Sequence, residues 1–442
     1  MSTTKTSLLD TASRWIDMAL KAGAKEARVS IGDGRERSIS IQDGAVDKLV
    51  ESGSREAELT VFIDGRTAGA SSSDLSANTL KKLAANAVAR AKLSGSDPHA
   101  GLPEVKPLEK DGKALGLYCP SVGAFSAAEM IAYAKKMESI GLADDRISRS
   151  GGAGMSTWEG QVALAASNGF AGSYEKSHCS AYVSLQAGAG DDLVQDAWYA
   201  SRLSMDGFPT AEAIAKKAVH RVTRLIGAKK VETRNVPVVL EPTMTSGLLR
   251  FVYACISGRS VDRRQTFLAD SLGKKVGNDL VTIVDDGLLI GGLGSAPFDG
   301  EGIPRRRTPV IEKGVLRNFL MDVTTARKLK MSPTGNSGGP SNLYWEKGTS
   351  KPEDIIASVD KGLLLTGTMG QGEDPTTGDI SKGAFGLWIE KGEIAYPVSE
   401  ITISANLKNL LNNVEMVGTD LVFDRSVCGP TVKFAEATVG GR

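Results

Sequence analysis

The sequence predicts an α+β protein with two N-terminal helix-and-hairpin modules, followed by a strand-rich, mostly antiparallel domain of barrel or sandwich type. Its 442 residues are too many for one compact core and favour two or three domains. The 50 glycines and the 5% share of aromatic residues indicate many turns and close packing of small residues. Helix and hairpin signals recur in the same order before residue 230, whereas strand signals dominate after it.

The first module covers residues 1–95. Apolar residues at helical spacing predict a helix from Ser7 to Leu20. Alternating patterns predict strands at 37–41 and 56–62, with Asp43-Gly44 as a hairpin turn between them. Ser76 is a typical N-cap for a second helix.

Residues 96–120 contain four prolines and no periodic pattern, so we expect an irregular connection there. The second module covers residues 121–230. Its signals are a helix at 127–140, a turn at Asn168-Gly169, a strand at 181–185 and a helix at 211–226.

The two modules share a spacing that suggests a structural duplication. The interval from Gly44 to Leu59 equals that from Gly169 to Ser184. The alternative is a pair of unrelated α+β modules, because short hairpin patterns recur by chance.

The third region covers residues 231–442. A strand at 236–240 precedes one buried helix, Thr243 to Ile256, and short strands and glycine turns follow. This composition predicts the antiparallel barrel-like or sandwich-like domain. The strand candidates are 281–284, 308–311, 316–320, 363–368, 385–389 and 401–404.

The balance of charge argues against nucleic acid as a partner. The chain has 53 Lys and Arg against 52 Asp and Glu, and Arg305, Arg306 and Arg307 form the only tight basic cluster. We therefore expect no direct contact with nucleic acid.

The N-terminus shows no signal-peptide pattern, and no apolar run approaches the roughly 20 residues that cross a bilayer. We expect a cytoplasmic protein that does not bind membranes.

The residues that usually carry chemistry are few. Histidine occurs only at His99, His178 and His220, and no pair has the i, i+4 spacing of a zinc-binding helix. We therefore expect no cofactor in this chain. Four cysteines, Cys119, Cys179, Cys255 and Cys428, are widely separated and are interpreted as reduced thiols.

The densest polar cluster is Pro297-Phe-Asp-Gly-Glu-Gly302 followed by the three arginines. Asp299 and Glu301 are two apart, so on a strand both side chains would lie on one face. Paired carboxylates can act as acid and base when their environments separate their pKa values. The favoured interpretation is a charged loop with local ion pairs.

Several motifs of the third region occur in the order of a known family. They are Ser257-Gly-Arg-Ser-Val261, Thr266-Phe-Leu-Ala-Asp270, Leu272-Gly273, Pro297-Phe-Asp-Gly-Glu-Gly302, Gly314-Val-Leu316, Thr324-Thr-Ala-Arg327, Thr334-Gly-Asn336, Gly429-Pro-Thr-Val432 and Val439-Gly-Gly441. This ordered set resembles the PmbA/TldE branch of the TldD/PmbA family, which is also labelled modulator of DNA gyrase.

The resemblance implies where a metal would be bound in a relative. In the TldD branch, a helix carries His-Glu-x-x-x-His, and a later cysteine completes a zinc site. Alignment on Gly247 places Phe251, Val252 and Ile256 at the positions of the two histidines and the glutamate. The cysteine's counterpart falls near Met416, before Cys428.

Three functions remain open. The leading hypothesis is a zinc-free subunit, not catalytic alone, that pairs with a TldD-like, zinc-bearing metallopeptidase subunit acting on extended, unfolded peptides. The second is an independent hydrolase that uses Asp299 and Glu301. The third is a non-enzymatic, homodimeric protein-binding or regulatory protein, as the gyrase label suggests.

Overall fold

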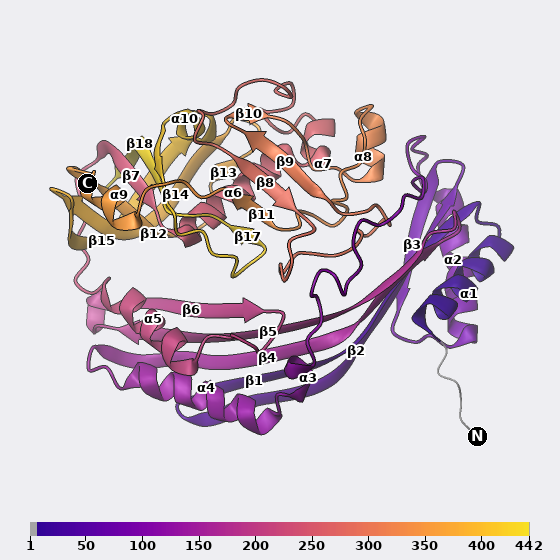
Figure 1. Ribbon diagram of the computed structural model, residues 1–442, viewed down its shortest axis with the longest axis horizontal. Coiled ribbons are helices and arrows are strands. Elements are labelled where there is room, and N and C mark those ends of the chain that lie inside the picture. Colours follow the sequence, from indigo (N-terminus) through magenta and orange to yellow (C-terminus); the bar gives the residue numbers. More distant parts are fainter. Residues whose placement is uncertain (1–6, 442) are drawn as a thin grey trace.

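The computed structural model describes residues 7–441, so the N-terminal segment used in the signal-peptide argument lies outside the described residues. The chain forms a long curved sheet with helices at both ends, and a strand-rich C-terminal body that lies over the concave face of the sheet (Figure 1). None of the helices within residues 7–441 has the length and apolar character that crossing a membrane requires.

The curved sheet has six antiparallel strands in the order β3-β2-β1-β4-β5-β6. Its central pair joins the two predicted modules, since β1 runs antiparallel to β4 from Arg28 opposite Ala166 to Ile41 opposite Ala153. The two modules therefore share one sheet. The strands are β1 (Glu26–Gln42), β2 (Ala45–Ile63), β3 (Arg66–Ser72), β4 (Ile147–Ala166), β5 (Ala171–Ala187) and β6 (Val194–Arg202).

Each half of the sheet has the order helix, three strands, helix, and this repeat agrees with a duplication. In the first half, α1 (Leu8–Lys21) and α2 (Ala77–Leu93) bury an apolar cluster with the ends of β1 and β2. In the second half, α4 (Ala127–Leu142) and α5 (Ala211–Thr223) pack in the same way on β4 and β5.

The first hairpin turn is locked by the other half of the sheet. Asp43 and Gly44 both have positive φ, as a two-residue hairpin turn of this type requires. Their backbone amides donate to the buried carboxylate of Glu138 on α4, at 3.1 and 2.7 Å. The carboxylate accepts from two amides that point away from the ladder, so α4 fixes the position of the turn.

The C-terminal body contains a closed five-stranded barrel. Neighbours pair in the order β12-β7-β18-β15-β14, and β12 also pairs with β14, which closes the ring. The barrel strands are β7 (Arg234–Leu240), β12 (Lys361–Met369), β14 (Asp379–Glu390), β15 (Glu393–Asn406) and β18 (Val432–Gly440), with β13 (Glu373–Asp374) beside β14 and β16 (Val414–Val417) beside β18.

A second sheet lies beside the barrel, and α6 (Pro242–Ile256) contacts both, so one apolar core runs through all three. This sheet has the order β10-β9-β8-β11-β17. Its strands are β8 (Ile283–Asp286), β9 (Arg307–Glu312), β10 (Val315–Leu316), β11 (Leu343–Trp345) and β17 (Val427–Cys428). The short helices are α3 (Pro120–Ala124), η1 (Gly190–Asp192), α7 (Gly258–Asp262), α8 (Val323–Lys328), α9 (Pro352–Ala357) and α10 (Leu407–Asn412).

The predicted fold class is confirmed, but some elements differ from the prediction. The strand expected at 316–320 ends at Leu316, because Arg317 and Asn318 donate their amides to the carbonyl of Val310 in an irregular turn. The strand expected at 37–41 extends from Glu26 to Gln42. Sequence patterns also missed β3 and β6, which lie at the two edges of the sheet.

Candidate functional site

The helix that would carry zinc ligands in a TldD-like relative is α6. Pro242 occupies its first turn, where the missing amide hydrogen costs nothing, and the helix ends at Ile256. Phe251 is 2% exposed, and Val252 and Ile256 are fully buried in the core shared by the barrel and the second sheet. None of the three side chains has a donor atom for a metal, and none can transfer a proton.

Met416, near the expected counterpart of the ligand cysteine, and the later Cys428 lie in different places. Met416 packs against an apolar cluster that includes Val239 and Leu364. Cys428 lies on β17, which packs against α6, and a side chain at the neighbouring Gly429 would overlap Thr245 of that helix. The Cys428 thiol donates to the carbonyl of Arg425 at 3.0 Å, and burial raises its pKa to about 11. At neutral pH and without a metal the thiol is protonated.

The residues around α6 therefore do not fit a zinc ion. Within residues 7–441, no three His, Cys, Asp or Glu side chains converge in a way that could hold a metal. Burial lowers the pKa of both His178 on β5 and His220 on α5. We therefore assign no metal-dependent reaction step to this chain.

Asp299 is a buried acceptor for the backbone. It accepts the amides of Glu301 and Ile303 through one oxygen, at 2.9 and 3.0 Å, and the amide of Ser337 through the other at 2.9 Å. Burial raises its pKa, although these three amides oppose the shift. Both carboxylate oxygens are engaged in holding two loops together.

Glu301 is also engaged, by two other partners. It accepts the amide of Val323, the first residue of α8, at 2.8 Å, and it lies 3.6 Å from the guanidinium of Arg28 on β1. Burial is the main cause of its raised pKa. This carboxylate connects the C-terminal body to the curved sheet.

The three consecutive arginines do not converge on one ligand. Arg305 bonds the hydroxyl of Ser341, Arg306 donates to the carbonyl of Pro333 at 3.1 Å, and Arg307 pairs with Glu346 at 2.8 Å. The structure thus gives Asp299, Glu301 and the arginines separate structural partners.

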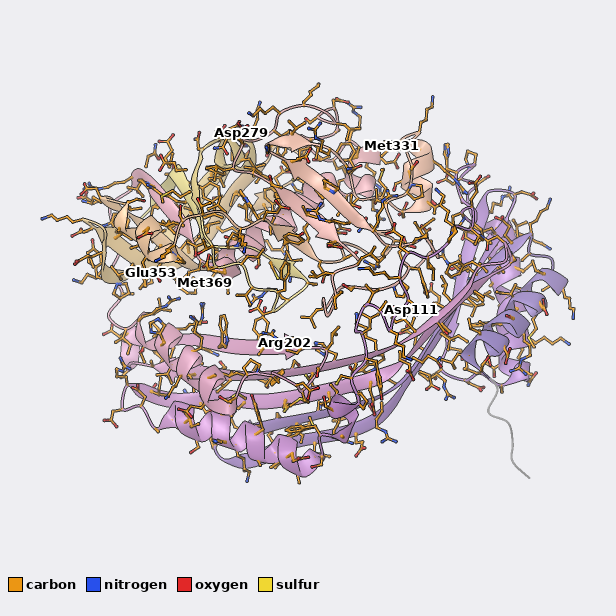
Figure 2. The ribbon with its side chains drawn as sticks, viewed as in Figure 1. Asp111, Arg202, Asp279, Met331, Glu353 and Met369 are labelled. Atoms are coloured by element: carbon orange, nitrogen blue, oxygen red, sulfur yellow. The ribbon has the colours of Figure 1, made fainter. Side chains whose placement is uncertain are left out.

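The two bodies enclose a cleft of about 280 Å³. One side is β6, which contributes Trp198, Tyr199 and Arg202 to the lining. Arg202 is labelled in Figure 2, on the side of the sheet nearest the C-terminal body. The other side is the start of α6 and the segment 420–429. The Arg425 guanidinium lies 4.7 Å from the centre of the Tyr199 ring, a cation–π contact across the cleft.

The whole chain is similar to proteins of one family. Residues 27–91, 120–226 and 233–441 match the models of the PmbA/TldA metallopeptidase domain 1, central domain and C-terminal domain. Metalloprotease PmbA of Escherichia coli O157:H7 is 32% identical over 417 residues, which cover 94% of this chain and 92% of that protein. The chain belongs to the PmbA/TldD family.

Solved structures of the PmbA/TldD family have the same fold. A protein named as a modulator of DNA gyrase from Bacteroides thetaiotaomicron superimposes with a TM-score of 0.91 at 28% identity, covering 98% of both chains. TldE from Thermococcus kodakarensis superimposes with a TM-score of 0.84 at 21% identity, covering 98% of this chain and 100% of that one. The second likeness concerns the fold alone.

In this PmbA/TldD member, the names of the relatives indicate a peptidase, whereas α6 has apolar side chains. The family models and relatives carry the word metallopeptidase or metalloprotease, which supports a peptidase-type role. The helix α6, however, has only apolar groups at Phe251, Val252 and Ile256. The assignment of these three positions to the zinc motif stays an expectation from the resemblance. The sequence gave no sign of the cleft, because β6 and residues 420–429 are over 200 residues apart.

Proposed function

We propose that this chain is the zinc-free subunit of a TldD/TldE-type metallopeptidase complex. It pairs with a TldD-like catalytic subunit and supports the degradation or processing of unfolded peptides. The observation that supports the proposal is the chemistry of α6: at Phe251, Val252 and Ile256, where the resemblance places the ligands and base of the TldD branch, the helix has buried apolar side chains. The hydrolytic water and the metal then belong to the partner.

The edge of the curved sheet supports a role in holding an extended peptide. Within residues 7–441, β6 pairs with β5 and with no other strand. Its C-terminal half lines the cleft. The amide of Ala197 donates to the side chain of its neighbour Asp196 at 2.7 Å, so it does not point into the ladder with β5. Backbone groups alternate along an antiparallel strand, which places the amides of Tyr199 and Ser201 on the same free edge.

An unpaired strand edge recognises main chain, because its backbone donors and acceptors can bind an extended peptide. On this edge the Ala197 amide is bound by Asp196 and the Ser201 carbonyl by Arg202, so the amides of Tyr199 and Ser201 are the groups that we assign to peptide binding. Trp198 and Tyr199 add apolar contact area beside this edge. Such a site binds unfolded segments of varied sequence and leaves folded proteins unbound. This is the specificity expected of a subunit that presents substrate to a catalytic partner.

Co-expression with a TldD-like chain that has His-Glu-x-x-x-His tests the proposal. Cleavage of an unstructured, internally quenched peptide is expected from the purified pair and not from this chain alone. The matched control is a pair in which the partner's motif glutamate is replaced by glutamine; it should assemble normally and cleave nothing. A stable homodimer that does not bind the TldD-like chain would instead favour the regulatory function.

A further inference from the structure

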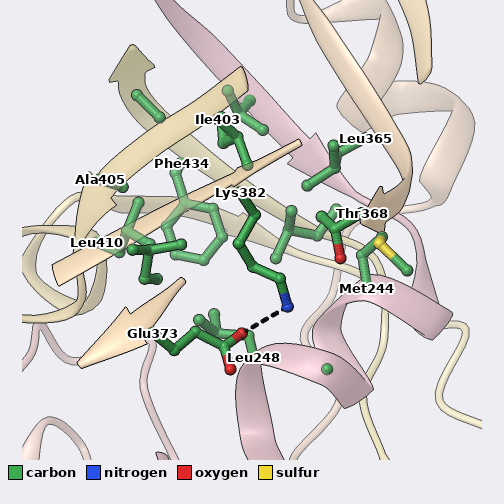
Figure 3. Close-up of a pocket in the computed structure, with 15 residues that line it drawn as sticks. Met244, Leu248, Leu365, Thr368, Glu373, Lys382, Ile403, Ala405, Leu410 and Phe434 are labelled. Carbon is green, nitrogen blue, oxygen red and sulfur yellow. Dashed lines mark hydrogen bonds and ion pairs between the residues drawn. The ribbon is translucent and has the colours of Figure 1, made fainter. Parts of the chain in front are cut away.

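The closed barrel contains a cavity of about 80 Å³ at the end that α6 covers. All five barrel strands contribute to its wall, and Met244 and Leu248 of α6 lie across it (Figure 3). The lining is apolar except for Thr368, Glu373 and Lys382. The Lys382 ammonium donates to Glu373 at 3.0 Å.

A lysine that points into an apolar barrel is unusual, because burying an ammonium costs free energy unless it is paired. The side chain of Lys382 is 17% exposed, and that of Glu373 is 34% exposed. Glu373 therefore lies on the solvent side of the ion pair, and Lys382 lies deeper in the barrel.

The two partners also differ in how firmly they are held. Lys382 is on the 12-residue strand β14 and is paired with Ile403 of β15. Glu373 is on the two-residue strand β13, in the connection between β12 and β14 that contains Gly370 and Gly372. Moving Glu373 breaks few contacts, whereas moving Lys382 would disturb the barrel wall. The lysine is the fixed group, and the glutamate is a counter-ion that can be displaced.

We propose that the barrel binds a small aliphatic carboxylate, whose carboxylate replaces Glu373 on Lys382 and whose branched apolar group fills the cavity. The shared chemistry has two sources: the C-terminal end of a peptide that finishes in an aliphatic residue, and a free short-chain acid. The site lies in this chain alone and does not depend on the proposed catalytic pairing.

Size and charge select this ligand class. The cavity is about half of the ~150 Å³ that admits benzene in an engineered core, so it suits a branched group of about four carbon atoms. An uncharged apolar ligand would leave the Lys382–Glu373 pair in place at the opening. A carboxylate gains a charge-assisted hydrogen bond from Lys382 and releases Glu373 to water.

Calorimetric titration of the full chain tests the site. The probes are 4-methylpentanoate, its uncharged amide, and N-acetyl-Ala-Ala-Leu with a free C-terminus. We expect binding of at least one of the two carboxylates, and binding of the amide weaker by about tenfold, the loss of a hydrogen bond to a charged group. The carboxylate that binds more tightly identifies the source of the ligand.

Two variants should shift the affinity in opposite directions. Lys382→Met should abolish carboxylate binding, whereas Glu373→Gln should strengthen it, because the internal competitor loses its charge. Lys382→Arg, which keeps the charge, should retain measurable binding and controls for damage to the barrel. Failure of both carboxylates to bind the folded wild-type chain, equal affinity for acid and amide, or unchanged binding by folded Lys382→Met would each overturn the proposal.

Discussion

The guanidinium of Arg221 on α5 lies 3.0 Å from the carboxylate of Glu241, the residue immediately before α6. Arg224 binds the same carboxylate, and Arg221 also lies 3.0 Å from Asp196 on β6. This buried network connects the curved sheet, the cleft and the start of α6. It positions β6 relative to α6.

Glu241→Gln should destabilise the C-terminal body by about 3 kcal/mol in urea unfolding, because the change leaves the guanidinium of Arg224 without its counter-charge and that of Arg221 with Asp196 alone. Glu212→Gln, which removes an exposed ion pair with Lys216, is the control and should have no measurable effect. An unchanged stability of Glu241→Gln would contradict the role assigned to this network.

The effect of Glu241→Gln should also depend on pH. Burial alone would raise the pKa of Glu241, but hydrogen bonds and charge from Arg224 and Arg221 outweigh it and hold the pKa below its ordinary value. The stabilisation is therefore present above the unfolded pKa of about 4.3 and disappears as the pH falls through the folded value. The difference in unfolding free energy between wild type and Glu241→Gln should therefore be smaller in acid. Urea unfolding of both proteins at pH 7 and at pH 3 measures this difference.

Asp299→Asn separates a structural carboxylate from a catalytic one. The amide nitrogen of asparagine cannot accept the backbone amides that Asp299 binds, so we expect a loss of about 2 kcal/mol in unfolding free energy. Partner-dependent cleavage per folded molecule should be unchanged. Loss of cleavage in a variant that is folded and still assembles would revive the hydrolase hypothesis.

The sequence predicted local structure more completely than long-range structure. The Asp43-Gly44 turn and the helix ending at Ile256 follow from residue type and spacing, and both occur as expected. The joining of the two modules into one sheet does not follow from residue type and spacing. The register of β1 against β4 joins residues up to 138 positions apart (Arg28 with Ala166, 166 − 28). No local pattern encodes such a pairing.

The same distinction holds at the candidate site. That Phe251, Val252 and Ile256 lie on one helix could be predicted from the sequence. The role of Asp299 could not be predicted, because it accepts the backbone amide of Ser337, in the loop between α8 and β11, and any residue type except proline can donate such an amide. The barrel cavity around Lys382 is formed by five strands spread over some 200 residues, so its existence depends on closure of the ring.

Ser201→Pro tests peptide binding at the free edge of β6. Proline removes the Ser201 amide, which the alternation along the strand places on the edge away from β5, and leaves the ladder to β5 intact, so stability should change little. The KM for peptide cleavage by the pair should rise about fivefold, the equivalent of one hydrogen bond, with kcat nearly unchanged. Ser201→Ala keeps the amide and should behave like wild type; a rise in KM for alanine as well would point to the side chain instead.

Thiol labelling tests the description of the cysteines. Burial raises the pKa of Cys179 and Cys255 to about 12 and that of Cys428 to about 11, so these thiols are protonated and shielded at neutral pH. Cys119 is the partly exposed one. Native protein should react at Cys119, and Cys119→Ser should show almost no labelling until urea is added. Rapid modification of Cys428 in the folded chain would show that the region beside α6 opens.

The most direct test of the zinc-free role is metal analysis of this chain by itself. The purified chain is equilibrated with zinc, passed through a desalting column, and assayed for bound metal and for peptide cleavage, with the TldD-like partner treated in parallel. We predict substoichiometric zinc and no cleavage for this chain, and one tightly held zinc for the partner. One zinc per molecule retained by this chain, lost together with activity on chelation, would contradict the account.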